Sequence, residues 1–188
     1  GEVCVGGVPI HTAHLSELRQ RVGIVTQDVQ LFQATVRDNL TFFNASIPDT
    51  RILEAVERVG LTSWYRTLPH GLDSQLGADG EGLSAGEAQL LAFTRVFLSN
   101  PGLVILDEAS SRLDPATERL IEQAMDALFV GRTVLVIAHR LATVRRVDDI
   151  LIIEAGRVCE YAPRADLARD PTSRFYRLLQ SGLEEVPA

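Results

Sequence analysis

Two short apolar runs with a helix-length segment between them constrain the fold more than any other feature of this chain. Leu103–Leu106 and Thr133–Ala138 are strand-sized and almost wholly apolar. Continuous apolar runs of this length are typical of strands buried on both faces of a sheet. Asp114-Pro115 between them predicts a helix start, with Asp as the cap and Pro in the first turn. Buried strand, helix and buried strand in this order predict an α/β layered fold with a mostly parallel sheet.

The same alternation of strand and helix signals continues along the rest of the chain. A helix is expected at Ser84–Ser99, where apolar residues recur on one stripe and Pro101 follows as a stop. Further strands are expected at Glu2–Val5 and Val22–Thr26, a hairpin at Asp149–Glu154 and Arg157–Tyr161, and helices at Leu15–Arg21, Val36–Phe42, Asp49–Val59 and Arg174–Leu179.

Composition excludes several classes of protein. The formal net charge of −7 argues against binding of nucleic acid through a basic face. No apolar run approaches the roughly 18–20 residues that span a bilayer. Cys4 and Cys159 match no metal-ligand spacing, so a reduced chain is expected. All 18 basic residues are Arg, and the 188 residues contain no Lys.

The strand at residues 103–107 ends in two adjacent acids, Asp107 and Glu108. In α/β proteins the carboxyl ends of strands form the ligand-binding edge of the sheet. One carboxylate there can hold Mg²⁺, and its neighbour can orient or deprotonate a water molecule. Taken alone, the pair is explained equally well as the cap of the next helix.

A second candidate site lies at Gly82-Leu83-Ser84-Ala85-Gly86-Glu87. Ser84 and Glu87 have the spacing of a capping box, which is by itself a sufficient structural explanation. A glycine-rich approach to a helix start also exposes backbone N–H groups to an anion, and Gly86 leaves room for a phosphate. Gln27 and His139, each just after an expected strand, are more often structural than catalytic when they occur alone.

Taken together and in this order, the motifs resemble the nucleotide-binding domain of ATP-binding-cassette (ABC) transporters over essentially the whole chain. The similar segments are Val25-Thr26-Gln27 for the Q-loop, Leu83-Ser84-Ala85-Gly86-Glu87 for the signature, Leu103–Glu108 for the Walker B strand, Ser111-Arg112-Leu113-Asp114 for the D-loop and His139 for the switch histidine. The resemblance implies a P-loop NTPase-like layered fold with ATP and Mg²⁺ as ligands. It implies a helical subdomain with the signature at about 35–98, the Walker B, D-loop and switch part of the core at about 100–162, and C-terminal helices at 163–188.

The resemblance also implies roles for single residues. Asp107 and Gln27 would contact Mg²⁺, Glu108 would activate water, and Gln27 and His139 would hold the γ-phosphate and the water in line. The signature residues and Asp114 would complete an ATP site that is held by a second ABC domain, identical or different. These signature residues are Leu83, Ser84, Ala85, Gly86 and Glu87. The segment Leu31–Leu40 is similar to exporters, in which a transmembrane domain precedes on the same polypeptide. The expected location is therefore the cytoplasmic face of the cell membrane, and the expected activity is ATP hydrolysis that powers export.

Three departures from the family pattern set limits on this interpretation. The signature usually reads Leu-Ser-Gly-Gly-Gln, whereas Ala85 and Glu87 replace its third and fifth residues here. Ala78 stands where exporters usually carry Glu. No G-x-x-x-x-G-K-[ST] phosphate loop (Walker A) occurs in the 188 residues. We therefore expect an ABC domain that is incomplete at its N-terminus, in which the isolated fragment binds ATP weakly and is inactive, while the full-length protein is an ATPase.

Two alternatives remain open at this point. One is the C-terminal half of a DNA-maintenance ATPase of the same superfamily, against which the acidic charge and the absence of coiled-coil heptads speak. The other is a non-catalytic or regulatory module that keeps the surface and has lost hydrolysis. Glu108 and His139 speak against that loss, whereas Ala85, Glu87 and the missing phosphate loop favour it.

Overall fold

A computed structural model describes residues 1–77, 82–107, 113–138 and 141–181 of the chain. The chain divides into two compact units, Gly1–Val136 and Ile137–Ala188. In the first unit the strands are β1 (Cys4–Val5), β2 (Val8–Pro9), β3 (Val22–Val25), β4 (Leu103–Asp107) and β5 (Thr133–Ile137), the last of which reaches the boundary. The helices of this unit are α1 (Leu15–Arg21), α2 (Val36–Thr41), α3 (Asp49–Arg58), α4 (Thr62–Thr67), the 3₁₀ turn η1 (Gly71–Asp73), α5 (Ala85–Ser99) and α6 (Pro115–Phe129).

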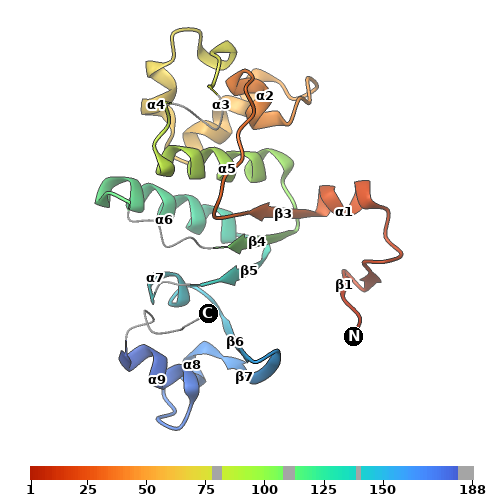
Figure 1. Ribbon diagram of the computed structural model, residues 1–188, viewed down its shortest axis with the longest axis vertical. Coiled ribbons are helices and arrows are strands. Elements are labelled where there is room, and N and C mark those ends of the chain that lie inside the picture. The colour runs from red at the N-terminus through yellow and green to blue at the C-terminus, as the bar shows by residue number, and fades with distance from the viewer. Residues whose placement is uncertain (78–81, 108–112, 139–140, 182–188) are drawn as a thin grey trace. The chain divides into compact units, whose positions relative to one another are not determined.

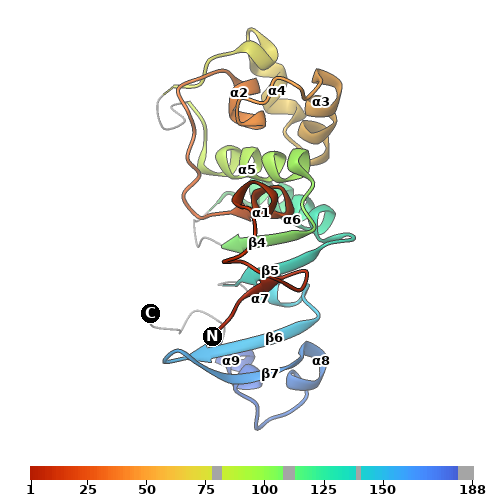
Figure 2. The ribbon, with the colours of Figure 1, turned by 90° about the vertical axis from the view of Figure 1, so that its right-hand side faces the viewer.

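The main sheet has the strand order β3-β4-β5. The strands β3 and β4 are parallel and pair Val22 with Leu103 through to Val25 with Leu106. Figure 2 shows the arrows of β4 and β5 pointing the same way. The prediction of a parallel sheet that alternates with helices is therefore confirmed, and α5 and α6 connect or cover its strands.

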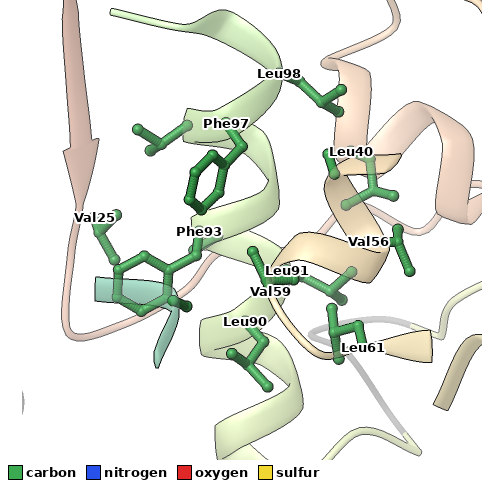
Figure 3. Packing of buried hydrophobic residues seen from close by; sticks show 14 of the residues in the cluster. Val25, Leu40, Val56, Val59, Leu61, Leu90, Leu91, Phe93, Phe97 and Leu98 are labelled. Atoms are coloured by element: carbon green, nitrogen blue, oxygen red, sulfur yellow. The ribbon is translucent and has the colours of Figure 1, made fainter. Parts of the chain in front are cut away.

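Helix α5 is the centre of the core because it is apolar on nearly all sides. In Figure 3, Phe93 and Phe97 lie on the side of Val25 in β3, while Leu91 and Leu98 face the helices α2 and α3. Such a helix is stable only between two layers, since each large apolar side chain that leaves water contributes about 1.5–3 kcal/mol. The sheet and the helices α2–α4 are these two layers.

One face of the sheet is uncovered by the described residues. Val104 and Leu106 are buried against the helices, whereas Ile24 of β3 and Leu135 and Ile137 of β5 are 58%, 52% and 49% exposed. The prediction that the run at residues 133–138 is buried on both faces is thus wrong for this chain. An apolar run predicts that both faces of a strand can be covered, but it does not supply the covering layer.

The second unit is a hairpin covered on one face by short helices. Its elements are α7 (Leu141–Val144), β6 (Asp149–Glu154), β7 (Arg157–Pro163), α8 (Arg164–Leu167) and α9 (Arg174–Ser181). The strands β6 and β7 pair in antiparallel register around Ala155-Gly156, and this hairpin was predicted. Val144, Leu167 and Phe175 form its small core. In the part of the chain that the structure describes, no helix combines the length and apolar character needed to cross a membrane.

Candidate nucleotide site

Two of the expected site residues lie at the carboxyl ends of neighbouring parallel strands. Asp107 is the last residue of β4, and Gln27 follows β3 by two residues. Because Val25 pairs with Leu106, both side chains belong to the same edge of the sheet. Gln27 is exposed and Asp107 half-buried. The edge therefore presents a carboxylate and an amide, both of which offer an oxygen atom as a metal ligand.

The carboxylate of Asp107 fits a divalent cation. It has no hydrogen-bond or ion-pair partner among residues 1–77, 82–107, 113–138 and 141–181. A half-buried carboxylate whose lone pairs are all unused is a suitable ligand for Mg²⁺, which binds through one or two carboxylates and keeps several water molecules. Within those ranges no group of three metal-ligating side chains comes together.

Ser84 begins helix α5 as its N-cap, and the predicted capping box is present. Its Oγ accepts from the Glu87 N–H at 3.2 Å. In return, Oε2 of Glu87 accepts from the Ser84 N–H at 2.8 Å and from the Ser84 hydroxyl at 2.9 Å. Ser84 is exposed, but both of its donors are occupied by the carboxylate of Glu87.

The first turn of α5 keeps two unused donors next to this box. The N–H groups of Ala85 and Gly86 have no acceptor within the described ranges. The N-terminus of a 15-residue helix also carries the positive end of its dipole. An anion that approaches this turn would find two backbone donors and a favourable field, opposed by the carboxylate of Glu87.

Gly86 has a structural role that the sequence did not reveal. It is buried, and a Cβ at this position would overlap Cγ2 of Thr117 in α6 and come within 3.6 Å of Leu113. The packing of α6 on this side is a second explanation for the glycine, and its approach to a phosphate stays a prediction. That space holds α6, so Gly86 allows two helix starts to lie side by side.

Asp114 caps the second of these helices. Its Oδ1 accepts from the N–H groups of Ala116 and Thr117 at 3.0 Å each, and its Oδ2 accepts from the Thr117 hydroxyl at 2.5 Å. These bonds, first of all the one from the Thr117 hydroxyl, hold the pKa of Asp114 below its usual range. Asp114 is exposed but already committed to its own helix.

The strand ends and the helix starts converge on one side of the first unit. In Figure 1, β3 and β4 point toward the side from which α5 and α6 begin, and the two helices run side by side in the same direction. The Gly86–Thr117 approach joins the two helix starts directly. Asp107, Gln27, Ser84 and Asp114 therefore belong to one face of this unit.

Other predicted site residues give different outcomes. Glu108 and His139 lie outside the described residues, as does Ala78. Leu83 is half-buried and packs against the core, whereas Ala85 is exposed. The sequence interpretation missed Thr117, although the cap Asp114 with Thr three residues later is a usual local signal for it.

An exposed cluster of aromatic side chains was also missed. Phe32, Phe42 and Phe43, here called the aromatic patch, are 41%, 59% and 57% exposed. The ring of Phe32 meets those of Phe42 and Phe43 edge-on at 6.2 and 5.4 Å between centroids. Phe42 and Phe43 both have positive φ angles, 51° and 62°, which bulky residues rarely adopt. Exposed apolar surface held by unfavourable backbone is typical of an interaction site.

Arg95 of α5 holds the aromatic patch to the segment after Gln27. Its guanidinium donates to the carbonyls of Asn39 and Gln30 at 2.8 and 2.9 Å and lies 4.7 Å from the Phe42 ring centroid. Burial lowers the pKa of Arg95 to about 10. Asn39, fully buried, completes the network by bonding both backbone groups of Phe32. The Arg95 side chain thus connects helix α5 with the aromatic patch and with the segment after Gln27.

Comparisons with known proteins agree with the motifs. A family model described as ABC transporter matches residues 1–111. An ABC transporter ATP-binding protein of Bacillus subtilis, YwjA, is 40% identical over 167 residues, covering 89% of this chain and 29% of the relative. ABC transporter B family member 21 of Arabidopsis thaliana is 34% identical over 180 residues, covering 96% of this chain and 14% of the relative.

A third relative names a transported compound. The fatty acid ABC transporter ATP-binding/permease protein of Mycobacterium bovis is 38% identical over 167 residues, which cover 89% of this chain and 26% of that protein. The chain spans less than a third of the length of each of these three relatives.

Proposed function

The chain belongs to the ABC transporter family, and from this premise we propose that it supplies the hydrolytic and signature parts of an ATP site that powers export. ATP-binding domains of this family are P-loop NTPase folds that use ATP and Mg²⁺. The observation that carries the proposal is the convergence of Asp107 and Gln27 with the starts of α5 and α6 on one face. The relatives named above are transporters, so transport is preferred over DNA maintenance.

Each of these residues has a defined task in the proposed site. Asp107 and Gln27 hold the cation, which when bound offsets negative charge on the phosphates. Glu108 accepts a proton from the attacking water, and His139 and Gln27 hold the γ-phosphate and the water in line. No phosphate loop occurs in these 188 residues, so the proposal assigns them no grip on the β-phosphate.

The start of α5 serves a second ATP molecule, held by a partner ABC domain. The N–H groups of Ala85 and Gly86, which have no acceptor among the described residues, and the exposed position of Ser84 support this assignment. Asp114 and Leu83 position the two helix starts rather than contact the nucleotide, since Asp114 is bonded to Thr117 and Leu83 packs against the core.

A transmembrane domain is the second proposed partner, on the same polypeptide and upstream, so that the chain works at the cytoplasmic face of the membrane. The aromatic patch supports a docking surface for it, because the patch exposes three rings next to the segment after Gln27. A displacement of that surface would reach helix α5 through Arg95, because this residue of α5 donates to the carbonyls of Asn39 and Gln30.

One observation favours a second candidate function, that of a regulatory half-site with little hydrolysis. Glu87 occupies both donors of Ser84 and places a carboxylate where phosphate would approach. In that case the chain would associate with a partner ABC domain without forming an ATP site that hydrolyses ATP. The two functions differ in whether Glu108 is needed for turnover.

The test is Glu108→Gln in the protein that carries this chain together with its membrane part. We expect ATP turnover to fall by at least about a hundredfold, the scale of a lost general base, while ATP binding remains. Glu57→Gln on the exposed side of α3 is the matched control. Unchanged turnover would remove Glu108 from its role and favour the regulatory function.

A further inference from the structure

A pocket on the first unit, away from the residues discussed above, gathers three arginines. It has a volume of about 250 Å³ and is formed by one face of α3, the C-terminal end of α5 and the residue before β5. Its principal lining side chains are Arg51, Glu54, Arg58, Phe97, Asn100 and Arg132. We propose that this pocket, here called the arginine pocket, binds an oxyanion of the phosphate class.

Two guanidinium groups of the arginine pocket lie about one aromatic ring. Arg58 and Arg132 lie 5.1 and 5.7 Å from the centroid of the Phe97 ring. Phe97 is 8% exposed, so the ring is a rigid part of the core that holds two like charges near each other. Burial and then the charge of Arg58 lower the pKa of Arg132, in keeping with two cations held about one ring. An anion between them would relieve the repulsion of their like charges.

The three arginines of the pocket have no carboxylate partner among the described residues. The chain has 25 acidic and 18 basic residues, so acids are in excess. Even so, Arg51, Arg58 and Arg132 form no ion pair within residues 1–77, 82–107, 113–138 and 141–181. Glu54 is the one acid of the lining, so the three cations exceed it by two charges. This excess matches a doubly charged phosphate.

Two of the three arginines are held by hydrogen bonds, whereas the side chain of Arg58 has no hydrogen-bond partner among the described residues. Arg132 donates to the carbonyls of Leu128 and Val130 and to Oδ1 of Asn100, and Arg51 donates to the carbonyl of Leu98. These bonds cap the C-terminal ends of α6 and α5. The guanidinium of Arg58 has no hydrogen bond within the described ranges, so its fork is available for bidentate binding of an oxyanion.

Arg132 also carries an unused donor. Its Nε is buried and has no hydrogen-bond partner in the described part of the chain. Buried donors are usually paired, and leaving one unpaired is costly. The network around Arg132 is therefore incomplete, as expected where a ligand or water adds an acceptor.

The test is calorimetric titration of the full chain with inorganic phosphate at constant ionic strength. We expect saturable binding, weakened at least about tenfold by Arg58→Gln, because a charge-assisted contact is lost. Glu54→Gln should tighten binding by about fivefold, since it removes the one opposing charge. Arg66→Gln, an exposed arginine of α4 outside the pocket, is the matched control and should leave the affinity unchanged.

The outcomes that overturn the proposal are equally specific. Absence of saturable binding at millimolar phosphate, or equal affinity of the wild-type chain and Arg58→Gln, contradicts it. Loss of binding in Ser84→Ala with retention in Arg58→Gln would place the anion at the start of α5 instead. Phosphoserine in a parallel titration distinguishes a phosphorylated side chain from a free ion, and binding of either supports the shared chemistry.

Discussion

Glu87 is the residue at which helix capping and phosphate binding oppose each other. Its carboxylate completes the capping box and stabilises the start of α5, yet it places a negative charge beside the Ala85 and Gly86 N–H groups. We expect Glu87→Gln to strengthen Mg-ATP binding by about fivefold in the assembled protein, because a unit charge in the first turn is worth about 1 kcal/mol. Equilibrium binding of a fluorescent ATP analogue measures this.

The same substitution should lower the free energy of unfolding by only about 0.5 kcal/mol, since Gln also completes a capping box and only the favourable charge at the helix start is lost. Glu87→Ala provides the comparison that separates charge from cap. It should also strengthen ATP binding, but lower the free energy of unfolding by about 1 kcal/mol through the weakened cap. Equal affinity in the wild-type protein and both variants would mean that the capping box already holds the carboxylate clear of the phosphate.

At the scale of elements, the close approach of α5 and α6 depends on the absence of a side chain at Gly86. We expect Gly86→Ala to destabilise the chain by about 1–3 kcal/mol, the usual cost of overpacking. The added Cβ overlaps the methyl group Cγ2 of Thr117, and a serine at position 117 would lack this methyl group. The double variant Gly86→Ala/Thr117→Ser should therefore regain most of this loss in denaturant unfolding, since Ser keeps the hydroxyl that bonds Asp114. Failure of this rescue would contradict the packing role.

Local signals predicted the elements well and the layers less well. Helix α6 begins at Pro115 as expected because Asp114 and Pro115 determine its start from neighbouring atoms. The exposed face of β5 was not predictable from local signals. Burial of Leu135 depends on a covering layer, and the residues of the strand itself do not say whether that layer is present.

The same distinction holds for the site. The capping box of Ser84 and Glu87 was predictable because its partners are three residues apart. The packing of Gly86 against Thr117 and the bonds of Arg95 to Asn39 and Gln30 join residues distant in sequence. A glycine in a motif can have a binding and a packing role, and only the tertiary contact reveals the packing role of Gly86. The roles of Glu108 and His139 stay predictions.

At the scale of the whole molecule, the proposed function makes the aromatic patch the surface through which hydrolysis would be coupled to transport. Phe42 and Phe43 adopt a backbone conformation that Asn accepts more easily than Phe. Residues that keep such strain while exposing more than half of a ring are not explained by stability. This combination favours selection for contact with a partner.

Phe43→Asn tests that explanation because stability and function should change in opposite directions. Relief of the positive φ should hold the free energy of unfolding constant or raise it by up to about 1 kcal/mol, despite the lost edge contact with Phe32. In the assembled transporter, ATP hydrolysis without substrate should persist, whereas transport should fall by about tenfold as an aromatic anchor is lost from the interface. Tyr161→Asn, at another strongly exposed aromatic residue, is the control and should leave transport unchanged. Full transport by a stabilised Phe43→Asn variant would exclude the aromatic patch as the docking surface and leave the strain at Phe43 without a functional reason.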